Sequence, residues 1–314
     1  MKRLPNRGAI FIISVWILTL LALMAVGLAY RISLELRLAD YDVGRLQLFY
    51  LMQGGLRQAA AVLQEDGLEA DSFQDAWAIP TDPKEPVPLG EGSFFLTIED
   101  EAARPNLNSV DQETLMRVPG MEESVASSLR VWRGDQDFSS SVVDQEETYY
   151  RSLTPPLERE KGPIQSLEEL ALVRGMTPSL AASLQSLFTV YGSKKINVNT
   201  ASEETFALLG LEESIAHELV RYRLGEDGEA GTEDDHVFHI VDELASAELF
   251  EALNLTPDLQ LTMAGLVSQM TVQSDHFRVR CKTVAKNGMA KTVVAVIQRT
   301  PKSPAVIKYW HEED

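Results

Sequence analysis

The feature that most constrains this chain is a run of 22 uncharged, mostly apolar residues from Ala9 to Tyr30. A helix of that length reaches ~33 Å, which matches the bilayer core of about 30 Å. Lys2, Arg3 and Arg7 precede the run, and basic flanks stay on the cytoplasmic side. We therefore predict a single membrane span with everything after it on the far side. The alternative is a secretory signal that is removed after Gly27-Leu28-Ala29.

The segment that follows predicts a continuation of the same helix. Apolar residues recur at helical spacing from Ile32 to Leu63, among charged residues such as Arg37 and Asp40. No proline occurs between Ala9 and Asp66, so one helix of about 58 residues is expected, with Gly44 or Gly54-Gly55 as possible bends.

A basic leader, a glycine, a long apolar run and an amphipathic extension together resemble the type IV pilin and pseudopilin family. The resemblance implies that prepilin peptidase cuts after Gly8 and leaves Ala9 as the mature N-terminus. Most members carry Glu at the fifth mature position, where this chain has Ile13. A carboxylate in lipid is costly unless it is paired, so its absence removes the need for a neighbour there. A plain single-span anchor is the alternative.

With its missing glutamate and large head, the chain is similar to the K family of minor pseudopilins in type II (general) secretion. That resemblance implies a non-catalytic tip subunit of the pseudopilus that helps to start assembly and export across the outer membrane. It implies a single-pass protein in the bacterial inner membrane with its C-terminal domain in the periplasm. The implied partners are minor pseudopilins I and J, which meet the helix between Arg31 and Leu63, together with the major pseudopilin, prepilin peptidase and membrane lipid. A minor pilin of a type IV pilus is an alternative.

The body of the chain predicts an α+β, pilin-like fold in which the long helix packs on a small antiparallel sheet. A proline-rich connector at 82–88 precedes an expected strand at 92–101. Two more strands are expected at 276–284 and 290–299, joined by the hairpin turn Lys286-Asn287-Gly288. The lone cysteine, Cys281, falls on the apolar face of its strand and is expected in the core.

Because strands lie on both sides of residues 106–267, that segment is predicted to be an inserted all-α domain. The predicted divisions are a leader at 1–8, a membrane helix at 9–30, a pilin-like domain at 31–105 and 268–314, and the insertion at 106–267. The insertion holds 29 acidic and 11 basic residues, which accounts for nearly all of the chain's net charge of −19.

The insertion contains an internal repeat. NLNSVDQETLMRVPGMEESVASSLRVWR from Asn106 aligns with NVNTASEETFALLGLEESIAHELVRYR from Asn197, and SLEELALVRGMTPSLAASL from Ser166 is a partial third copy. Each copy predicts two helices around a glycine turn at Gly120, Gly175 or Gly210. Ser109 and Thr200 are the expected N-caps.

These units resemble the helix-hairpin-helix motif, and a membrane-anchored DNA-binding protein is therefore a rival hypothesis. Such hairpins bind phosphate with the help of nearby Lys or Arg. Here two of the hairpins run into Glu122-Glu123 and Glu212-Glu213. Nucleic acid is not an expected partner, and packing is the expected role of the hairpins.

Two acidic loops predict structural calcium, which takes six to eight oxygen ligands from flexible loops. The K family resemblance also implies calcium in the helical domain. One expected ligand set is Asp135, Asp137, Glu146 and Glu147. The other is Asp227, Glu233, Asp234 and Asp235. Solvated acidic turns without a bound ion are the alternative.

No catalytic motif stands out, and we expect no enzyme. His236 and His239 have H-x-x-H spacing, but two ligands do not define a zinc site. The chain has no G-x-S-x-G elbow, P-loop or dinucleotide fingerprint.

Overall fold

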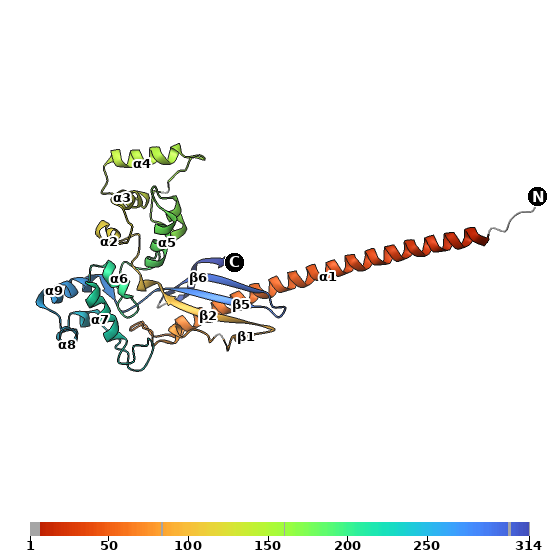
Figure 1. The fold of residues 1–314 in the computed structure, drawn as a ribbon. Helices are drawn as coiled ribbons and strands as arrows, with labels where there is room; N and C mark the ends of the chain where they lie inside the picture. Colours follow the sequence, from red (N-terminus) through yellow and green to blue (C-terminus); the bar gives the residue numbers. More distant parts are fainter. Residues whose placement is uncertain (1–6, 83, 160, 301–302, 314) are drawn as a thin grey trace, which may run out of the picture.

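The computed structural model describes residues 7–82, 84–159, 161–300 and 303–313. One helix, α1 (Arg7–Glu65), runs for 59 residues without interruption. In Figure 1 its first half extends away from the body of the molecule, and its second half lies along the sheet. The prediction of a single long helix is confirmed.

Five strands form an antiparallel sheet in the order β1-β2-β5-β6-β7. The bounds are β1 Val87–Leu89, β2 Gly92–Asp100, β5 His276–Val284, β6 Ala290–Thr300 and β7 Ser303–Glu313. The three expected strands are β2, β5 and β6, so these predictions are confirmed. The central position of β5 joins residues nearly 200 positions apart, because Ser93 pairs with Val284 and Asp100 with Phe277.

The sequence did not predict the two edge strands. β1 contains Pro88, which a strand tolerates only at an edge where the missing N–H bonds to no neighbour. β7 pairs along β6 from Thr292–Glu313 to Thr300–Ser303, with two register shifts. Most of its side chains are exposed, so no alternation of apolar and polar residues marked it as a strand.

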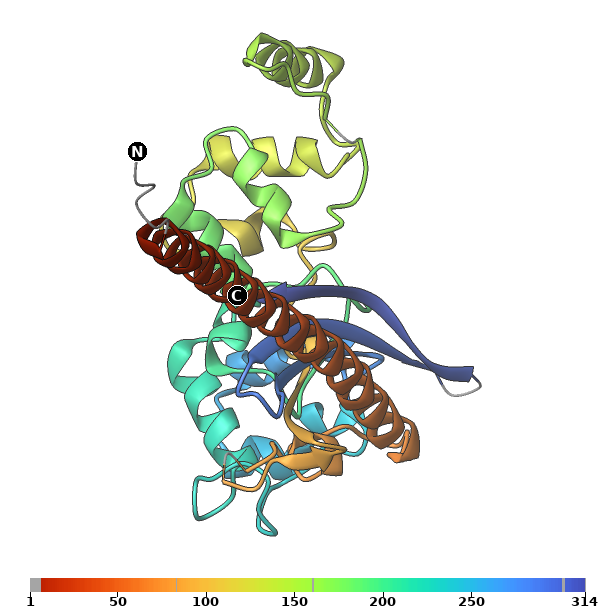
Figure 2. The same cartoon turned by 90° about the vertical axis from the view of Figure 1, so that its right-hand side faces the viewer.

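The second half of α1 covers one face of this sheet, as Figure 2 shows. Leu56, Ala59 and Leu63 of α1 join Trp77, Phe277 and the inward side chains of β2, β5 and β6 in one core. Cys281 is fully buried there, as predicted. Gly55 faces it closely enough that a Cβ at that position would clash with the Cys281 Sγ.

Apart from the short 3-10 helix η1, which precedes β1, the other helices of the described chain lie between β2 and β5 in the sequence. The α-helices are α2 Gln112–Met116, α3 Glu123–Trp132, α4 Ser140–Ser152, α5 Pro178–Leu187, α6 Glu203–Leu208, α7 Glu213–Arg223, α8 Ala247–Ala252 and α9 Pro257–Leu266. The 3-10 helices are η1 Ala76–Ala78, η2 Glu101–Ala103, η3 Leu167–Leu172, η4 Val241–Ala245 and η5 Val267–Gln269. The domain boundaries predicted from sequence stay predictions.

Two separate cores hold this helical region together, and each corresponds to one copy of a larger repeat. The first repeat, residues 106–190, surrounds a core that includes Leu129 and Trp132. The second repeat, residues 196–272, surrounds a core that includes Phe206 and Leu219. The short parallel pairing of β3 (Ile196–Asn197) with β4 (Met270–Thr271) closes the second repeat. An equivalent parallel bridge, Asn106 with Thr189, closes the first.

The repeat extends further than the sequence alignment indicated. The partial copy begins with a 3-10 helix, η3, before Gly175 and α5. A matching unit occurs in the second repeat, where η4 and α8 lead through Asn254 to α9. Asn254 takes the left-handed conformation, with φ of 50°, that Gly175 takes with φ of 79°. Asn tolerates that conformation better than most residues, so this fourth turn forms without a glycine and the glycine pattern did not predict it.

The predicted N-caps are wrong by two residues. Asp111 caps α2 by accepting from the backbone N of Thr114, and Ser202 caps α6 by accepting from the backbone N of Thr205. Ser109 instead donates to the carbonyl of Asn106, and Thr200 donates to the buried carboxylate of Asp100. The short polar run before each helix offered several possible caps, and the sequence pattern did not separate them.

Candidate functional site: the long helix, its junction and the acidic loops

The long helix α1 has two parts with opposite surroundings. From Ile10 onward it is long and apolar enough to cross a membrane, and none of its most apolar window is buried. Ile13, at the position of the missing glutamate, is 57% exposed. Leu48 and Leu51, in contrast, are 3% and 4% exposed against the sheet. The leader residues 1–6 lie outside the described residues, and Gly8 and Ala9 lie in the first turn of α1.

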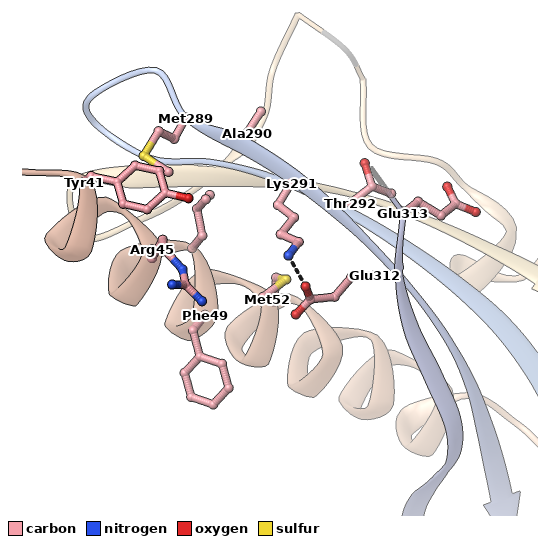
Figure 3. Close-up of a pocket in the computed structure, with 11 residues that line it drawn as sticks. Tyr41, Arg45, Phe49, Met52, Met289, Ala290, Lys291, Thr292, Glu312 and Glu313 are labelled. Atoms are coloured by element: carbon pink, nitrogen blue, oxygen red, sulfur yellow. Dashed lines mark ion pairs between the residues drawn. The ribbon is translucent and has the colours of Figure 1, made fainter. Parts of the chain in front are cut away.

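A cavity of about 580 Å³ lies where α1 leaves the sheet (Figure 3). Tyr41, Arg45 and Phe49 line it from α1, and residues 289–292 and 312–313 line it from β6 and β7. Lys291 and Glu312 form an ion pair across its floor. The α1 residues that line the cavity thus belong to the Arg31–Leu63 segment that was predicted to meet partners. Nothing in the cavity singles out a ligand.

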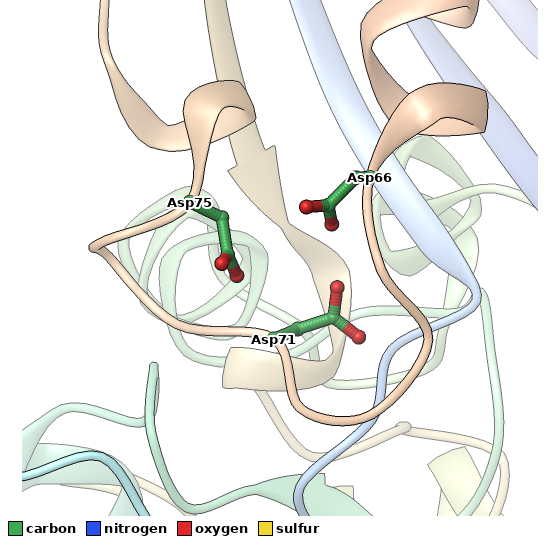
Figure 4. Close-up of side chains that lie close together, drawn as sticks. All are labelled: Asp66, Asp71 and Asp75. Carbon is green, nitrogen blue, oxygen red and sulfur yellow. The ribbon is translucent and has the colours of Figure 1, made fainter.

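Three carboxylates converge where α1 ends (Figure 4), and their oxygens lie within 4.8 Å of one another. They belong to Asp66, Asp71 and Asp75, and sequence reasoning did not pick them out. Arg299 of β6 reaches into the group: its Nη1 donates to Asp66 at 2.8 Å, and its Nη2 donates to both oxygens of Asp71. The backbone N of Ser274 also donates to Asp71, at 2.7 Å.

Burial raises the pKa of Asp71 to about 7, against the opposing attraction of Arg299. Burial also raises the pKa of Asp66, and the charge of Asp75 adds to that effect. The guanidinium of Arg299 and the backbone N–H of Ser274 supply hydrogen bonds to these carboxylates from within the protein. The geometry of the three aspartates is therefore that of a structural joint. It ties the end of α1 to β6 and to the linker before β5, which are far apart in sequence.

The first predicted calcium set does not come together. Asp135 accepts from Nε and Nη2 of Arg133 at 2.7 and 2.8 Å and from Nε of Arg130 at 2.8 Å. Burial raises the pKa of Asp135, but the hydrogen bonds from the two arginines outweigh it and leave the pKa below its usual value. Asp137 also pairs with Arg130, at 2.8 Å. Arginines therefore already neutralise both aspartates.

The glutamates of that set lie apart on α4. Glu146 accepts from Ser128 at 3.2 Å and from Arg174 at 3.1 Å. Glu147 forms ion pairs with Arg151 at 3.1 Å and with Lys161. Each carboxylate of the first set thus has a cationic partner in the protein. Its role as a calcium site stays a prediction.

The second predicted set shares one glycine-rich loop after α7. Asp234 accepts from Thr232 Oγ1 at 2.8 Å and from the backbone N of Glu226 at 2.7 Å, and these bonds lower its pKa to about 2. Asp235 accepts from the backbone N of Gly231 at 2.7 Å, and Asp227 from that of Glu229 at 2.8 Å. Glu233 is exposed. Unlike the first set, these acids bond to backbone and hydroxyl groups.

The described histidines do not build a metal centre. His236 stacks on Tyr222 with ring centroids 4.5 Å apart, and its Nδ1 lies 2.9 Å from the Tyr222 carbonyl. Among the described side chains, Asp66, Asp71 and Asp75 are the one group of three or more potential ligands, and no histidine belongs to it.

Sequence reasoning also missed the polar residues that hold each repeat closed. Arg133 donates to the carbonyls of Leu107 and Val110 at 2.6 and 2.7 Å. Arg223, at the aligned position, donates to the carbonyls of Val198 and Ala201 at 2.8 Å each. The aligned arginines are 8% and 7% exposed. Their position at the end of both aligned copies was the signal that could have identified them.

The asparagines of the N-[LV]-N motif act in the same way. Asn108 exchanges two hydrogen bonds with the backbone of Ile164, at 2.9 and 2.8 Å. Asn199 exchanges two with the backbone of Phe238, both at 2.9 Å. Each asparagine thereby bonds to the backbone in the way a neighbouring strand would, and it fixes the later segment of the repeat that contains Ile164 or Phe238. The motif therefore helps to hold each repeat closed.

Comparison with known proteins shows which proteins this chain is similar to. Residues 99–193 match the family model described as type II secretion system protein K, and this match covers the first repeat. Protein K of the type II secretion system of Klebsiella pneumoniae is 24% identical over 229 residues, which is 65% of this chain and 69% of the relative. The family model, this relative and the structural match described next all support membership of the protein K family of type II secretion systems.

The fold of this chain agrees with a solved structure. A chain in the crystal structure of the GspK-GspI-GspJ complex from the enterotoxigenic Escherichia coli type 2 secretion system matches with a TM-score of 0.65 and 16% identity. The match covers 88% of this chain and 99% of that one. Neither the DNA-binding alternative nor the type IV pilus alternative is favoured by these matches.

Proposed function

We propose that this chain is a protein K family member and a non-catalytic tip subunit of the pseudopilus, anchored in the bacterial inner membrane by a single span. Its head would lie in the periplasm and help to start pseudopilus assembly and protein export across the outer membrane. The observation that carries this proposal is α1 itself. Its first half is apolar and exposed, and its second half is built into the sheet of the head.

The residue at position 13 supports the place at the tip. Ile13 lies within the apolar part of α1, where a carboxylate would cost several kcal/mol unless it were paired. A subunit without that carboxylate has no unmet charge that requires a neighbour at the same level in the membrane. It can therefore occupy the first position of an assembly that grows beneath it.

The start of α1 fits processing by prepilin peptidase between Gly8 and Ala9. Removal of the basic leader would leave the apolar helix in the membrane with a free amine at Ala9. The orientation follows from Lys2, Arg3 and Arg7, which hold the leader in the cytoplasm before cleavage.

The proposed partners are minor pseudopilins I and J, followed by the major pseudopilin. The structural relative comes from a complex of GspK, GspI and GspJ, and it matches this chain over nearly the whole of its own length. The test is affinity purification of the full-length, tagged protein from detergent-extracted membranes of cells that express I and J. Recovery of both subunits is expected. A protein that stays monomeric in their presence would argue against the proposed function.

The helix pairs of the two repeats would serve as packing modules. Two of the three glycine turns pack against other parts of the protein: a Cβ at Gly210 would meet Arg117, and one at Gly175 would meet Val125. Together with the acidic flanks, this favours a structural role over nucleic-acid binding. A gel shift with duplex DNA at low salt should show no binding at micromolar protein.

We also propose that Asp227, Glu233, Asp234 and Asp235 hold structural calcium. Gly225, Gly228 and Gly231 all have positive φ, of 67°, 71° and 85°, so the loop backbone turns tightly around these acids. Calcium would supply the positive charge that the first set receives from arginine and lysine.

Metal analysis and thermal unfolding with and without a chelator test this calcium site. Calcium should co-purify with the wild-type protein, and the chelator should lower its Tm. Asp234→Asn should abolish the effect of the chelator, whereas the matched variant Asp137→Asn should preserve it. A protein without calcium and with a Tm that the chelator does not change would disprove the site.

A further inference from the structure

A buried acid lies where the sheet of the head meets the second repeat. Asp100 is the last residue of β2, and it is 4% exposed. Its Oδ1 accepts from the backbone N of Ala102 at 2.8 Å. Its Oδ2 accepts from Thr200 at 2.6 Å, and it also lies 2.7 Å from Ser274 Oγ and 3.0 Å from Asn197 Nδ2. All four of these partners are uncharged.

The contacts of Asp100 join segments that are far apart in the sequence. Asp100 ends a strand of the sheet, just before the chain enters the first repeat. Asn197 and Thr200 belong to the start of the second repeat. Ser274 lies in the segment that leads from β4 back to β5. The side chain of Asp100 therefore lies at the attachment of the second repeat to the head, and its charge affects that attachment.

The charged side chains on the segments around Asp100 bond to one another rather than to Asp100. The pairs are Arg299 with Asp66 and Asp71, Arg278 with Glu101, Arg104 with Glu99, His276 with Asp275, and His217 with Glu203. Asp75 accepts from the backbone N of Ser72 at 2.7 Å. Among the described residues, no ion pair includes Asp100. Its surroundings therefore stabilise a neutral group better than a charged one.

Asp71 is a second buried acid at this junction, and it shares hydrogen-bond donors with Asp100. The backbone N of Ser274 donates to the Asp71 carboxylate at 2.7 Å, while its Oγ contacts Asp100. Asn197 Nδ2 lies 3.0 Å both from the Asp71 carbonyl and from the Asp100 carboxyl group. Arg299 already bonds to both carboxylate oxygens of Asp71. A negative charge on Asp100 would therefore be buried without a compensating cation, which is strongly unfavourable.

The hydrogen-bond partners indicate which of the two acids is neutral. In the described structure the Asp71 side chain bonds only to N–H groups, from Arg299 and Ser274, and these groups cannot accept a hydrogen bond from a protonated acid. Asp100 instead contacts the hydroxyl group of Ser274, which can accept one. Burial raises the pKa of both acids, and Arg299 opposes that effect at Asp71. Asp71 is the alternative holder of the proton.

We propose that Asp100 is a neutral carboxylic acid that donates a hydrogen bond to the Ser274 hydroxyl group, and that loss of its proton at alkaline pH loosens the attachment of the second repeat to the sheet. The junction is then a pH-sensitive switch within the fold. This inference goes beyond the proposed function and does not depend on it, because every residue that it uses belongs to the head and the second repeat.

Urea unfolding of the full-length protein in detergent, from pH 4 to pH 8, tests where the proton is held. Asp100→Asn keeps the shape of a neutral acid. The folded-state pKa of Asp100 lies above its unfolded value of about 4, so the wild type should lose stability relative to this variant as the pH rises from there. The ratio of the two unfolding equilibrium constants should change by up to about tenfold per pH unit.

Asp71→Asn is the matched variant for this measurement. It removes the carboxylate that holds the buried guanidinium of Arg299, so it should be less stable than the wild type at pH 7 and should show no gain as the pH rises. A ratio for Asp100→Asn that does not change with pH would overturn the inference. A gain with rising pH in Asp71→Asn would also overturn it, because it would place the proton on Asp71.

Infrared spectroscopy and hydrogen exchange of the full-length protein test the proton and the switch. The carbonyl band of a protonated carboxylic acid should be present at pH 7 in the wild type and in Asp71→Asn and missing from Asp100→Asn. Once rising pH has removed the band from the wild type, its amides at 196–200 and 270–275 should exchange at least severalfold faster than those of Asp100→Asn at the same pH. A band that Asp100→Asn retains, or equal exchange after the band is lost, would overturn the inference.

Discussion

The two repeats of the helical region share one scaffold and differ in the segment that follows their second helix. Both begin with an N-[LV]-N motif, both cap their first helix with Asp or Ser, and both end the second helix with a buried arginine. In the first repeat Asp135 closes on Arg133 through two hydrogen bonds. In the second, Arg223 and Asp235 form no ion pair in the described structure, and Nε of Arg223 has no hydrogen-bond partner there.

This difference shows that the segment after the second helix is the part of the repeat that can take on a separate function. In the first repeat Asp135 and Asp137 are paired with arginines, and the chain continues into α4. The second leaves its acids on a glycine-rich loop that contacts the segment after α1, where Gln74 donates to the Thr232 carbonyl at 2.6 Å. Burial lowers the pKa of Arg223 to about 10, with the charge of Asp235 as a weaker opposing effect. A cation held by this loop would therefore lie close to the joint between the helix and the head.

The largest expected effect distinguishes the two closing arginines. Arg133→Met should lower the free energy of unfolding by about 3–4 kcal/mol, because two buried carbonyls lose their donor and Asp135 keeps only its hydrogen bond from Arg130. Arg223→Met should cost about 2–3 kcal/mol, because only the two carbonyls lose a donor. Urea unfolding of both variants measures the difference. Equal costs would show that the Asp135 contact does not distinguish the repeats.

The glycine turns should respond alike in the two repeats. Gly120 and Gly210 have φ of 81° and 95°, so Gly120→Ala and Gly210→Ala should each cost about 1–2 kcal/mol. Gly265 lies inside α9 with open space around it, and Gly265→Ala should be neutral or stabilising by up to about 1 kcal/mol. Thermal unfolding compares the three. A neutral result at one turn only would indicate that the two turns are not equivalent.

The smallest effect concerns acid. The pKa of Asp135 is lower in the folded state than in the unfolded chain, so its contribution to stability is present above the unfolded pKa of about 4 and is lost as the pH falls through the folded value. Because the group is partly exposed, Asp135→Asn should cost about 1 kcal/mol at pH 7. Melting curves from pH 7 to pH 3 should converge for wild type and variant. Parallel curves over that range would contradict the assigned pairing.

Much of the architecture could be predicted from the sequence. The apolar run and its amphipathic extension predicted α1, because both depend on local spacing. Alternation and the Asn287-Gly288 turn predicted β5 and β6. The edge strand β7 was not predicted, because its side chains are mostly exposed and its position depends on pairing with β6 rather than on its own pattern.

The site was harder to predict, because its residues come together only through long-range contacts. Asp71 and Arg299 are separated by more than 200 positions, and neither has an unusual local context. The acidic loops were visible as composition. Composition could not show that arginines and lysines already neutralise one set while the other set bonds to its own backbone.

The central claim is that α1 remains in the membrane as part of a pseudopilin, and the N-terminus of the mature protein tests it most directly. Intact-mass analysis and N-terminal sequencing of the protein from native membranes should find Ala9 as the first residue, with the whole apolar run retained. A chain that begins at Tyr30 and is recovered without detergent would contradict the account.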